Sequence, residues 1–324
     1  MKQVEIASGV FHLQGGTNMG LLVRDGKGLL IDAGLDKDAA RQALRAAEGA
    51  GVTLEAVLLT HAHADHFGGA YFLQQRLGVP LYAPALEAAL MEHPIIEPLY
   101  LFGDAAPIGE LCGKFTLAQA CQIDHVIPAP VVVPVVATSV ASAGRATTEV
   151  VTTSHLLEIG PFRVEIVPLP GHAPNQVGVA VGEVLFCADA VFPAETLHKH
   201  KLTFCVDLDE TLATLQRLPE LPYTRFAPGH GPAYAAGEEI AQACAANRER
   251  LEEVRAQVYA ALAEPQETST IVRQVADHFG LRIATATAYF LTQATILAAL
   301  SSLERAGQAA VLMEDNRLLW QRTR

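Results

Sequence analysis

The stretch from Thr60 to His66, which reads THAHADH, constrains the fold of this 324-residue chain more than any other part of it. It follows a short, fully apolar run, Ala56–Leu59, which predicts a buried strand. Four side chains that can bind metal ions stand within six residues, and burying such a polar cluster without a partner is costly. A divalent metal ion is a suitable partner for imidazole and carboxylate groups. The stretch therefore predicts a metal-binding loop at the end of a strand.

Three later segments repeat this arrangement, with a ligand-type residue placed just after an apolar strand. His172 follows VEIVPLPG, Asp189 follows VLFCA, and His230 follows RFAPG. Each of these segments alone is weak evidence for a metal site. Together with the first stretch, they give five His and two Asp at four strand ends. Seven ligands exceed the four of a structural zinc site, so we expect two metal ions with open coordination positions.

The spacing H-x-H-x-D-H followed by three separated ligands resembles the metallo-β-lactamase-fold hydrolases at all seven positions, over roughly residues 1–240. The resemblance implies an α/β fold, a four-layered αβ/βα sandwich with the metals at one edge. It implies that one metal is held by His61, His63 and His172, the second by Asp65, His66 and His230, and that Asp189 bridges them. It also places Asp32 behind the metals rather than on them.

A two-metal site of this kind predicts metal-assisted hydrolysis. Two cations a few Å apart lower the pKa of a bridging water and polarise the substrate oxygen. Asp65 is the candidate catalytic residue, because its carboxylate can orient the nucleophile or carry a proton. We expect a small ester, thioester or lactone as substrate. Two alternatives stay open: a metal-dependent ribonuclease or phosphodiesterase, and a mononuclear iron persulfide dioxygenase.

The chain divides by pattern into a catalytic domain at 1–240 and a helical domain at 241–324, with the boundary near 240–262. Residues 86–150 contain many prolines and no clean period, which predicts an insertion that covers the pocket as a lid. Beyond a long helix at 238–262, helices are predicted near 268–279, 284–291 and 293–306. A final hairpin around Asp315-Asn316 completes an order that resembles a winged helix.

The charge distribution argues against a nucleic-acid partner. The net charge is −12, and all of it lies in residues 1–244, because residues 245–324 hold nine Arg against nine acidic residues. A nucleic-acid-binding module normally carries a basic face. We therefore expect a small-molecule substrate, and we expect the C-terminal region to pack on the metal domain, shape its cleft or make a homodimer.

The cysteine pattern and the absence of a signal sequence predict a cytoplasmic protein. The five Cys include no C-x-x-C pair, so a disulfide framework or an all-thiolate zinc site is not expected. The stretch 126–143 is almost uncharged, but its three prolines favour extended chain over a membrane span. We expect zinc as the metal, with iron and manganese as alternatives.

The remaining histidines lie outside the ligand pattern. We expect surface or structural roles for His12, His93, His125, His155 and His278. His198 and His200, shortly after Asp189, are candidates for the pocket wall, and Asn18 is a candidate to approach the site from a hairpin. Cys187 is two residues before Asp189, so strand alternation would point both to one side, although a buried, inert thiol is the expected role.

Overall fold

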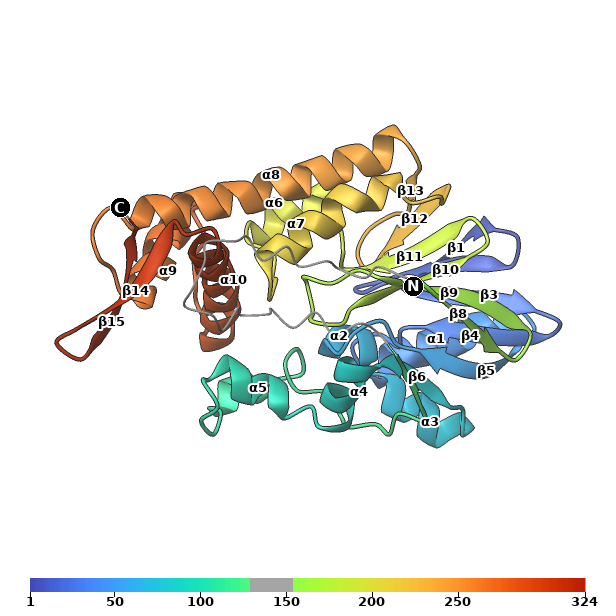
Figure 1. Ribbon diagram of the computed structural model, residues 1–324. Coiled ribbons are helices and arrows are strands. Elements are labelled where there is room, and N and C mark those ends of the chain that lie inside the picture. Colours follow the sequence, from blue (N-terminus) through green and yellow to red (C-terminus); the bar gives the residue numbers. More distant parts are fainter. Residues whose placement is uncertain (129–153, 324) are drawn as a thin grey trace.

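The computed structural model describes residues 1–128 and 154–323. Two β-sheets face each other, and helices cover the outer side of each sheet (Figure 1). This arrangement confirms the predicted four-layered αβ/βα sandwich. The C-terminal helices and a two-stranded hairpin extend from the end of one outer helical layer (Figure 1).

The first sheet follows the chain order from β1 to β7, antiparallel up to β4 and parallel from β4 to β7. Its strands are β1 (Lys2–Ala7), β2 (Val10–Gln14), β3 (Met19–Arg24), β4 (Lys27–Ile31), β5 (Thr53–Leu58), β6 (Leu81–Pro84) and β7 (His125–Ile127). The turn between β3 and β4 needs two residues with positive φ, and Asp25 and Gly26 supply them at 52° and 73°. The predicted hairpin at this turn is confirmed.

The second sheet has the order β13-β12-β11-β10-β9-β8, in which only β11 and β12 run parallel. Its strands are β8 (His155–Ile159), β9 (Phe162–Pro168), β10 (Val177–Val181), β11 (Val184–Ala188), β12 (Arg225–Pro228) and β13 (Tyr234–Ala235). The separate C-terminal hairpin consists of β14 (Ala309–Glu314) and β15 (Arg317–Arg322).

The helices occupy the outer layers and the C-terminal region. They are α1 (Lys37–Gly49), α2 (Ala64–Phe67), α3 (Ala70–Leu77), α4 (Ala85–Glu92), α5 (Ile96–Leu101), α6 (Ala194–His200), α7 (Leu208–Arg217), α8 (Glu238–Ala261), α9 (Thr268–His278) and α10 (Ala286–Arg305), with the short 3₁₀ turns η1 (Gly109–Cys112) and η2 (Leu218–Glu220). Helix α1 begins where Asp36 caps the backbone N–H groups of Asp38 and Ala39.

Three groups of buried apolar side chains hold the layers together. Between the sheets, Leu29 and Ile31 of the first sheet pack in one cluster with Val164 and Val179 of the second. A second cluster joins the outer face of the first sheet to α1 and α3. Both faces are buried at residues 28–31 of β4 and 56–58 of β5, and these parts read as continuous apolar runs rather than alternating ones.

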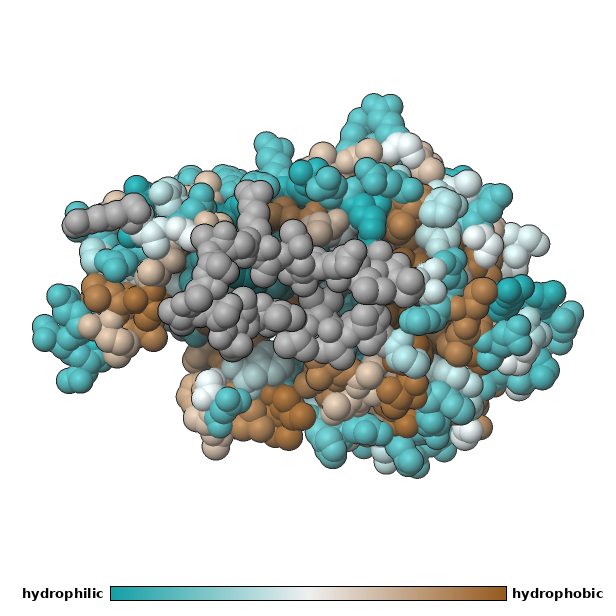
Figure 2. Space-filling view, viewed as in Figure 1, coloured by the Kyte–Doolittle hydropathy of each residue, from teal (hydrophilic) through white to brown (hydrophobic). Residues whose placement is uncertain are grey.

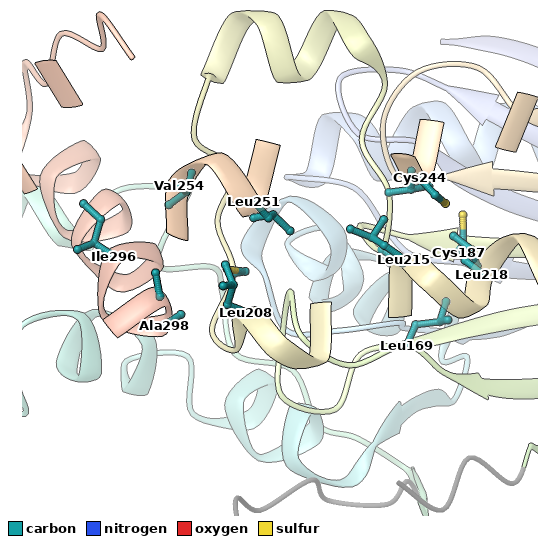
Figure 3. Close-up of a cluster of buried hydrophobic side chains, with 14 of the residues drawn as sticks. Leu169, Cys187, Leu208, Leu215, Leu218, Cys244, Leu251, Val254, Ile296 and Ala298 are labelled. Atoms are coloured by element: carbon teal, nitrogen blue, oxygen red, sulfur yellow. The ribbon is translucent and has the colours of Figure 1, made fainter. Parts of the chain in front are cut away.

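The third cluster runs from the second sheet into the C-terminal helices without interruption. Figure 3 shows Leu169 and Cys187 of the sheet side near Leu215, with Leu251 of α8 and Ile296 of α10 further along the same cluster. The predicted boundary near 240 falls in the first turn of α8, whose buried side chains contribute to this cluster. The division into two domains stays a prediction, as does the winged-helix character of the C-terminal region.

Two elements differ from what the sequence predicted. The segment 86–150 contains a strand that the sequence did not predict, β7, which pairs with β6 and extends the first sheet. The role of this segment as an insertion that covers the pocket stays a prediction. Residues 129–150 of that segment, and most of the uncharged stretch 126–143, lie outside the described residues. The helices predicted at 284–291 and 293–306 are one helix, α10, because no Gly or Pro interrupts the chain between them.

The α5–η1 segment contacts the start of α10, far away in the sequence. Glu110 accepts a hydrogen bond from the Ala286 N–H at 2.8 Å, and its carbonyl accepts one from Thr287 Oγ1 at 2.8 Å. The rings of Phe102 and Phe290 meet edge to face. These contacts join the α5–η1 segment to the first half of α10.

Four of the five thiols are buried. They belong to Cys121, Cys187, Cys205 and Cys244, whereas Cys112 of η1 is half-buried. Burial raises the pKa of Cys121, Cys205 and Cys244 to about 12. Such thiols are inert at neutral pH, because the thiolate is the reactive form.

One helix in the described ranges, α10, is long and apolar enough to span a membrane by length and composition. Within the fold, 44% of its most apolar window is buried, and the core helix of a soluble protein passes the same test. Exposed large apolar side chains occur on the C-terminal hairpin, at Val311, Met313 and Leu318. Figure 2 shows a second apolar area at the lower edge of the molecule, over α5.

Candidate metal centre

The structure brings all seven predicted ligand residues together at one end of the sandwich. They stand on the loops that follow β5, β9, β11 and β12 and on the short helix α2, which lies near the junction of the sheets in Figure 1. Their ligand atoms form three overlapping groups, each within 4.8 Å: His61, His63 and His172; His61, His66 and Asp189; Asp65, His66 and His230. Their role as metal ligands stays a prediction.

The first group contains three imidazoles in close contact. The Nδ1 atom of His63 lies 2.8 Å from Nε2 of His172, and the ring of His61 stands edge-on to both. Burial lowers the pKa of all three side chains, and for His61 and His63 the neighbouring histidines lower it further. Neutral imidazole is the form that binds a metal ion, so the surroundings favour the ligand state.

The group of Asp65, His66 and His230 mixes imidazole and carboxylate. His230 Nε2 lies 3.6 Å and His66 Nε2 3.9 Å from Asp65 Oδ2. Burial alone would lower the pKa of His66, but the carboxylates of Asp189, Asp65 and Asp32 raise it well above its usual range.

Asp189 lies between this group and the group of His61, His63 and His172. Its Oδ2 is 3.5 Å from His172 Nε2 and 3.4 Å from His230 Nε2, and its Oδ1 is 3.3 Å from His66 Nε2. Cys187 is buried, as expected for an inert thiol, and it does not point to the same side as Asp189, because Ala188 has a φ of 46° and breaks the strand alternation. Cys187 faces the core cluster, and Asp189 enters the site.

Buried polar atoms without a hydrogen bond support a metal-binding site. Among the described residues, His61 Nε2, His66 Nε2 and Asp189 Oδ1 are fully buried and have no hydrogen-bond partner. Leaving a buried acceptor unsatisfied costs about 1–3 kcal/mol, and native proteins seldom do so. These atoms converge on the same small volume, where divalent cations would satisfy them, so the residues present fit the expected metals.

Asp32 holds the inner side of the site in place. Its carboxylate accepts hydrogen bonds from His66 Nδ1 at 2.8 Å and from the Thr60 backbone N–H at 2.8 Å. The Thr60 hydroxyl also donates to Asp32 and lies 3.0 Å from His61 Nδ1. These bonds turn the Nε2 atoms of His61 and His66 toward the centre, which is how residues behind a metal orient its ligands.

Sequence reasoning missed Glu87, a fully buried residue of α4. Its carboxylate accepts the backbone N–H of Ala62 at 2.8 Å and that of Asn175 at 2.8 Å. These two N–H groups belong to the loops that carry His61–His63 and His172, so Glu87 ties the two loops together. Burial raises the pKa of Glu87 to about 7. Burial and the carboxylates of Asp65 and Glu87 also raise the pKa of nearby Glu97 well above its usual range.

The loop between β2 and β3 braces the opposite side. As predicted, Asn18 approaches the site: its side-chain amide donates to the carbonyls of Pro228 at 3.0 Å and Gly231 at 2.7 Å, on either side of His230. Thr17, which the sequence did not single out, donates its hydroxyl to Asp65 Oδ2 at 2.9 Å. Gly229 is required for this packing, since a Cβ atom there would lie 2.1 Å from Asp189 Oδ1.

The C-terminal region reaches the site through one peptide. The carbonyl of Phe204 accepts a hydrogen bond from His172 Nδ1 at 2.9 Å, and the Phe204 ring packs against His63. On either side of Phe204, the Thr295 hydroxyl of α10 donates to the Thr203 carbonyl at 3.2 Å and accepts the Cys205 N–H at 3.4 Å. Helix α10 thereby holds the peptide that orients His172.

The other histidines have the expected structural or surface positions. His12 is buried, donates to the Pro228 carbonyl at 3.3 Å, and burial lowers its pKa to about 4. His93, His125, His155 and His278 are exposed. His198 and His200 are exposed on α6, and burial, followed by the charges of Lys199 and His230, lowers the pKa of His200.

Comparison with known sequences shows which proteins the chain is similar to. It is 26% identical over 223 residues to a probable metallo-hydrolase, YqgX, of Bacillus subtilis, covering 66% of this chain and 85% of that protein. It is 31% identical over 109 residues to a hydroxyacylglutathione hydrolase of a Bradyrhizobium species. That match covers 34% of this chain and 42% of the enzyme.

Solved structures show the same fold along nearly the whole chain. A beta-lactamase domain protein from Burkholderia ambifaria superposes with a TM-score of 0.71 at 20% identity, covering 99% of this chain and 94% of that one. A metallo-beta-lactamase family protein from Thermus thermophilus gives 0.69 at 19% identity, with 98% and 100% coverage. The family profile described as the metallo-beta-lactamase superfamily matches residues 13–230, a span that contains all seven clustered residues. The chain therefore belongs to the metallo-beta-lactamase superfamily.

Proposed function

We propose that the protein is a dinuclear metal hydrolase that cleaves a small ester, thioester or lactone. The position of Asp189 carries the proposal. Its two oxygens lie 3.3 to 3.5 Å from nitrogens of His66, His172 and His230. His172 belongs to the group with His61 and His63, and His66 and His230 belong to the group with Asp65. A carboxylate placed between two such groups is suited to bridge two cations.

The residues around the site perform distinct tasks in this proposal. Two divalent cations, when bound, would supply Lewis acidity and lower the pKa of a water molecule. Asp32 and the Phe204 carbonyl hold His66 and His172 so that each directs Nε2 inward. Thr17 fixes one oxygen of Asp65, which leaves the other free to orient the attacking water and accept its proton.

A small acyl substrate suits the molecule better than a nucleic acid. The Bradyrhizobium protein is named as a hydrolase of hydroxyacylglutathione, and this chain resembles part of it. Several C-terminal arginines are engaged within the chain: Arg305 pairs with Asp207 and Asp209, Arg317 with Glu314, and Arg322 stacks on Tyr259. These contacts support the proposal, because they leave fewer cations for a phosphate backbone.

The proposal includes zinc as the metal, a cytoplasmic location and a homodimer as the assembly. Iron and manganese stay as alternatives, because imidazole and carboxylate ligands also suit them. Metal analysis of the purified protein, followed by size-exclusion chromatography with light scattering, measures the metal and the assembly directly.

The test combines metal content with a panel of substrates. We expect about two metal ions per chain and hydrolysis of thioesters, esters or lactones. His63→Ala and Asp189→Ala should lose turnover and metal while keeping the circular dichroism spectrum of the parent. His93→Ala, which alters an exposed histidine outside the site, is the matched control and should retain both.

Other outcomes would replace the proposal. One iron per chain with oxygen uptake on a persulfide would identify a dioxygenase. Cleavage of RNA or a phosphodiester with no acyl hydrolysis would identify a nuclease. Full turnover in His63→Ala or Asp189→Ala would remove the site assignment itself.

A further inference from the structure

A small pocket lies beside the ligand groups, between the metal-binding loops and helices α4 and α5. One wall contains Ala62, His63 and Pro174 of the loops, and the other contains Glu87, Leu90 and Glu97 of the helices. The pocket has room for a group about the size of one water molecule. Because His63 forms part of its wall, a substrate at the metal centre can extend into it.

Two carboxylates face this pocket, and they differ in how they are satisfied. Both oxygens of Glu87 accept backbone N–H groups, as described above. Glu97 is 7% exposed and has no hydrogen bond or salt bridge to any of the described residues. An unpaired buried carboxylate is costly, so its position calls for a partner that the described part of the chain does not contain.

The charges around Glu97 define what that partner must be. Glu87 and Asp65 are close enough to repel its negative charge. None of the described residues that line the pocket is Lys or Arg. A positively charged group would therefore suit Glu97, and none of the described residues that line the pocket supplies one.

We propose that this pocket binds a primary ammonium group of the substrate, with Glu97 as its ion-pair partner. This inference rests on the proposed function and narrows its substrate class to acyl compounds that carry an amine. An ammonium group matches a space for one water and donates up to three hydrogen bonds, whereas a guanidinium is planar and larger. The carboxylates of Glu87 and Glu97 also offset the repulsion between the ammonium and the neighbouring metal ions.

Matched substrates test the proposal, because an ammonium and a methyl group have nearly the same size. The β-alanyl and butanoyl thioesters of one thiol form such a pair, and glycyl with propanoyl and 4-aminobutanoyl with pentanoyl extend the series. For at least one pair, the metal-loaded enzyme should favour the amine by ~10-fold or more in kcat/KM, the scale of a charge-assisted hydrogen bond. Glu97→Gln should abolish that preference, and it should leave kcat/KM for the alkyl substrate and the metal content unchanged.

The matched control is Glu92→Gln. Glu92 lies on the same helix as Glu87 but outside the pocket, where it accepts the Ile123 N–H at 3.1 Å. This variant should keep the preference for the amine. Loss of preference in both variants would overturn the assignment to Glu97.

Three results would overturn the proposal. The first is a wild-type enzyme that does not distinguish the members of any pair. The second is an equal loss on both members in Glu97→Gln together with lost metal, which would make Glu97 a charge-balancing residue. The third is activation of butanoyl hydrolysis by K⁺ or NH₄⁺ in wild type but not in Glu97→Gln, which would assign the pocket to a free cation.

A binding measurement separates this proposal from the proposed function. Calorimetric titration of zinc-loaded protein with glycine, β-alanine and 4-aminobutanoate, each against the alkanoate of equal length, needs no turnover. At least one amino acid should bind ~10-fold more tightly than its partner to wild type, and none should do so to Glu97→Gln. Equal affinities within every pair would refute the ammonium pocket even if the thioesters are hydrolysed, and failure to hydrolyse them would refute the function alone.

Discussion

Replacing Thr295 with valine tests whether helix α10 controls the orientation of a predicted metal ligand. Thr295 is 1% exposed, and its hydroxyl bonds to the peptides on both sides of Phe204. The Phe204 carbonyl in turn accepts the Nδ1 proton of His172. Valine keeps the shape of threonine but removes the hydroxyl, so the substitution deletes both bonds without opening a cavity.

The size of the effect follows from these contacts. The bonds of 3.2 Å and 3.4 Å are long, so their loss should lower the free energy of unfolding by about 1–2 kcal/mol. Removing a partner of a metal-bound histidine costs about 10–100-fold in metal affinity. Because Thr295 acts on that partner rather than on His172 itself, we expect the lower end, about 10-fold weaker zinc binding.

Zinc affinity from chelator competition and the absorption spectrum of the cobalt-substituted protein are the two readouts. Thr292→Val is the control, since the Thr292 hydroxyl donates to Ala288 in its own helix and does not reach the Phe204 segment. Thr295→Ser keeps the hydroxyl and should bind zinc as tightly as the parent. If Thr295→Val loses stability but binds zinc as tightly as the parent, α10 does not position His172 and the reasoning fails.

Three further predictions concern the same end of the sandwich. Asp32→Asn should weaken zinc binding by about 10–100-fold, because it replaces the carboxylate that orients His66; equilibrium dialysis measures this. Gly229→Ala should abolish turnover, because the new Cβ would displace the Asp189 carboxylate; steady-state hydrolysis measures this. His12→Asn should reduce the loss of unfolding free energy between pH 6.5 and pH 4, which urea unfolding measures. The pKa of His12 falls to about 4 on folding, so protons favour the unfolded state in that range, by about 3 kcal/mol in total.

Control variants separate these effects from general damage. Gly113→Ala places a Cβ in ordinary contact, 3.8 Å from the Glu110 carbonyl oxygen, and should keep full turnover. His93→Asn changes an exposed imidazole and should leave the dependence of stability on pH as in the parent. A steep acid loss of stability in His12→Asn equal to that of the parent would contradict the assignment to His12, and tight zinc binding by Asp32→Asn would contradict the role of Asp32.

The clustering of the seven site residues was predictable because each follows an apolar strand, and strand ends of a layered fold meet at one edge. The hairpin at Asp25-Gly26 was predictable from local turn chemistry. Glu87 was not, because it bonds to residues 25 and 88 positions away and no motif marks such contacts. The same holds for Thr295, whose partner Thr203 is 92 residues away.

Two features depart from the local sequence pattern because of the tertiary fold. β7 is three residues long, so its apolar content gives no period, and its pairing with β6 defines it. Cys187 and Asp189 diverge because of a positive φ at Ala188, a residue type that seldom adopts one.

The distribution of thiols gives the protein a native attachment point for a probe. Of the five cysteines only Cys112 is partly accessible, so a maleimide dye should label the folded chain at one position. Cys112 ends η1, the turn that touches the start of α10 through Glu110. A fluorophore there would report, in real time and without any engineered cysteine, whether these two segments separate when a ligand enters.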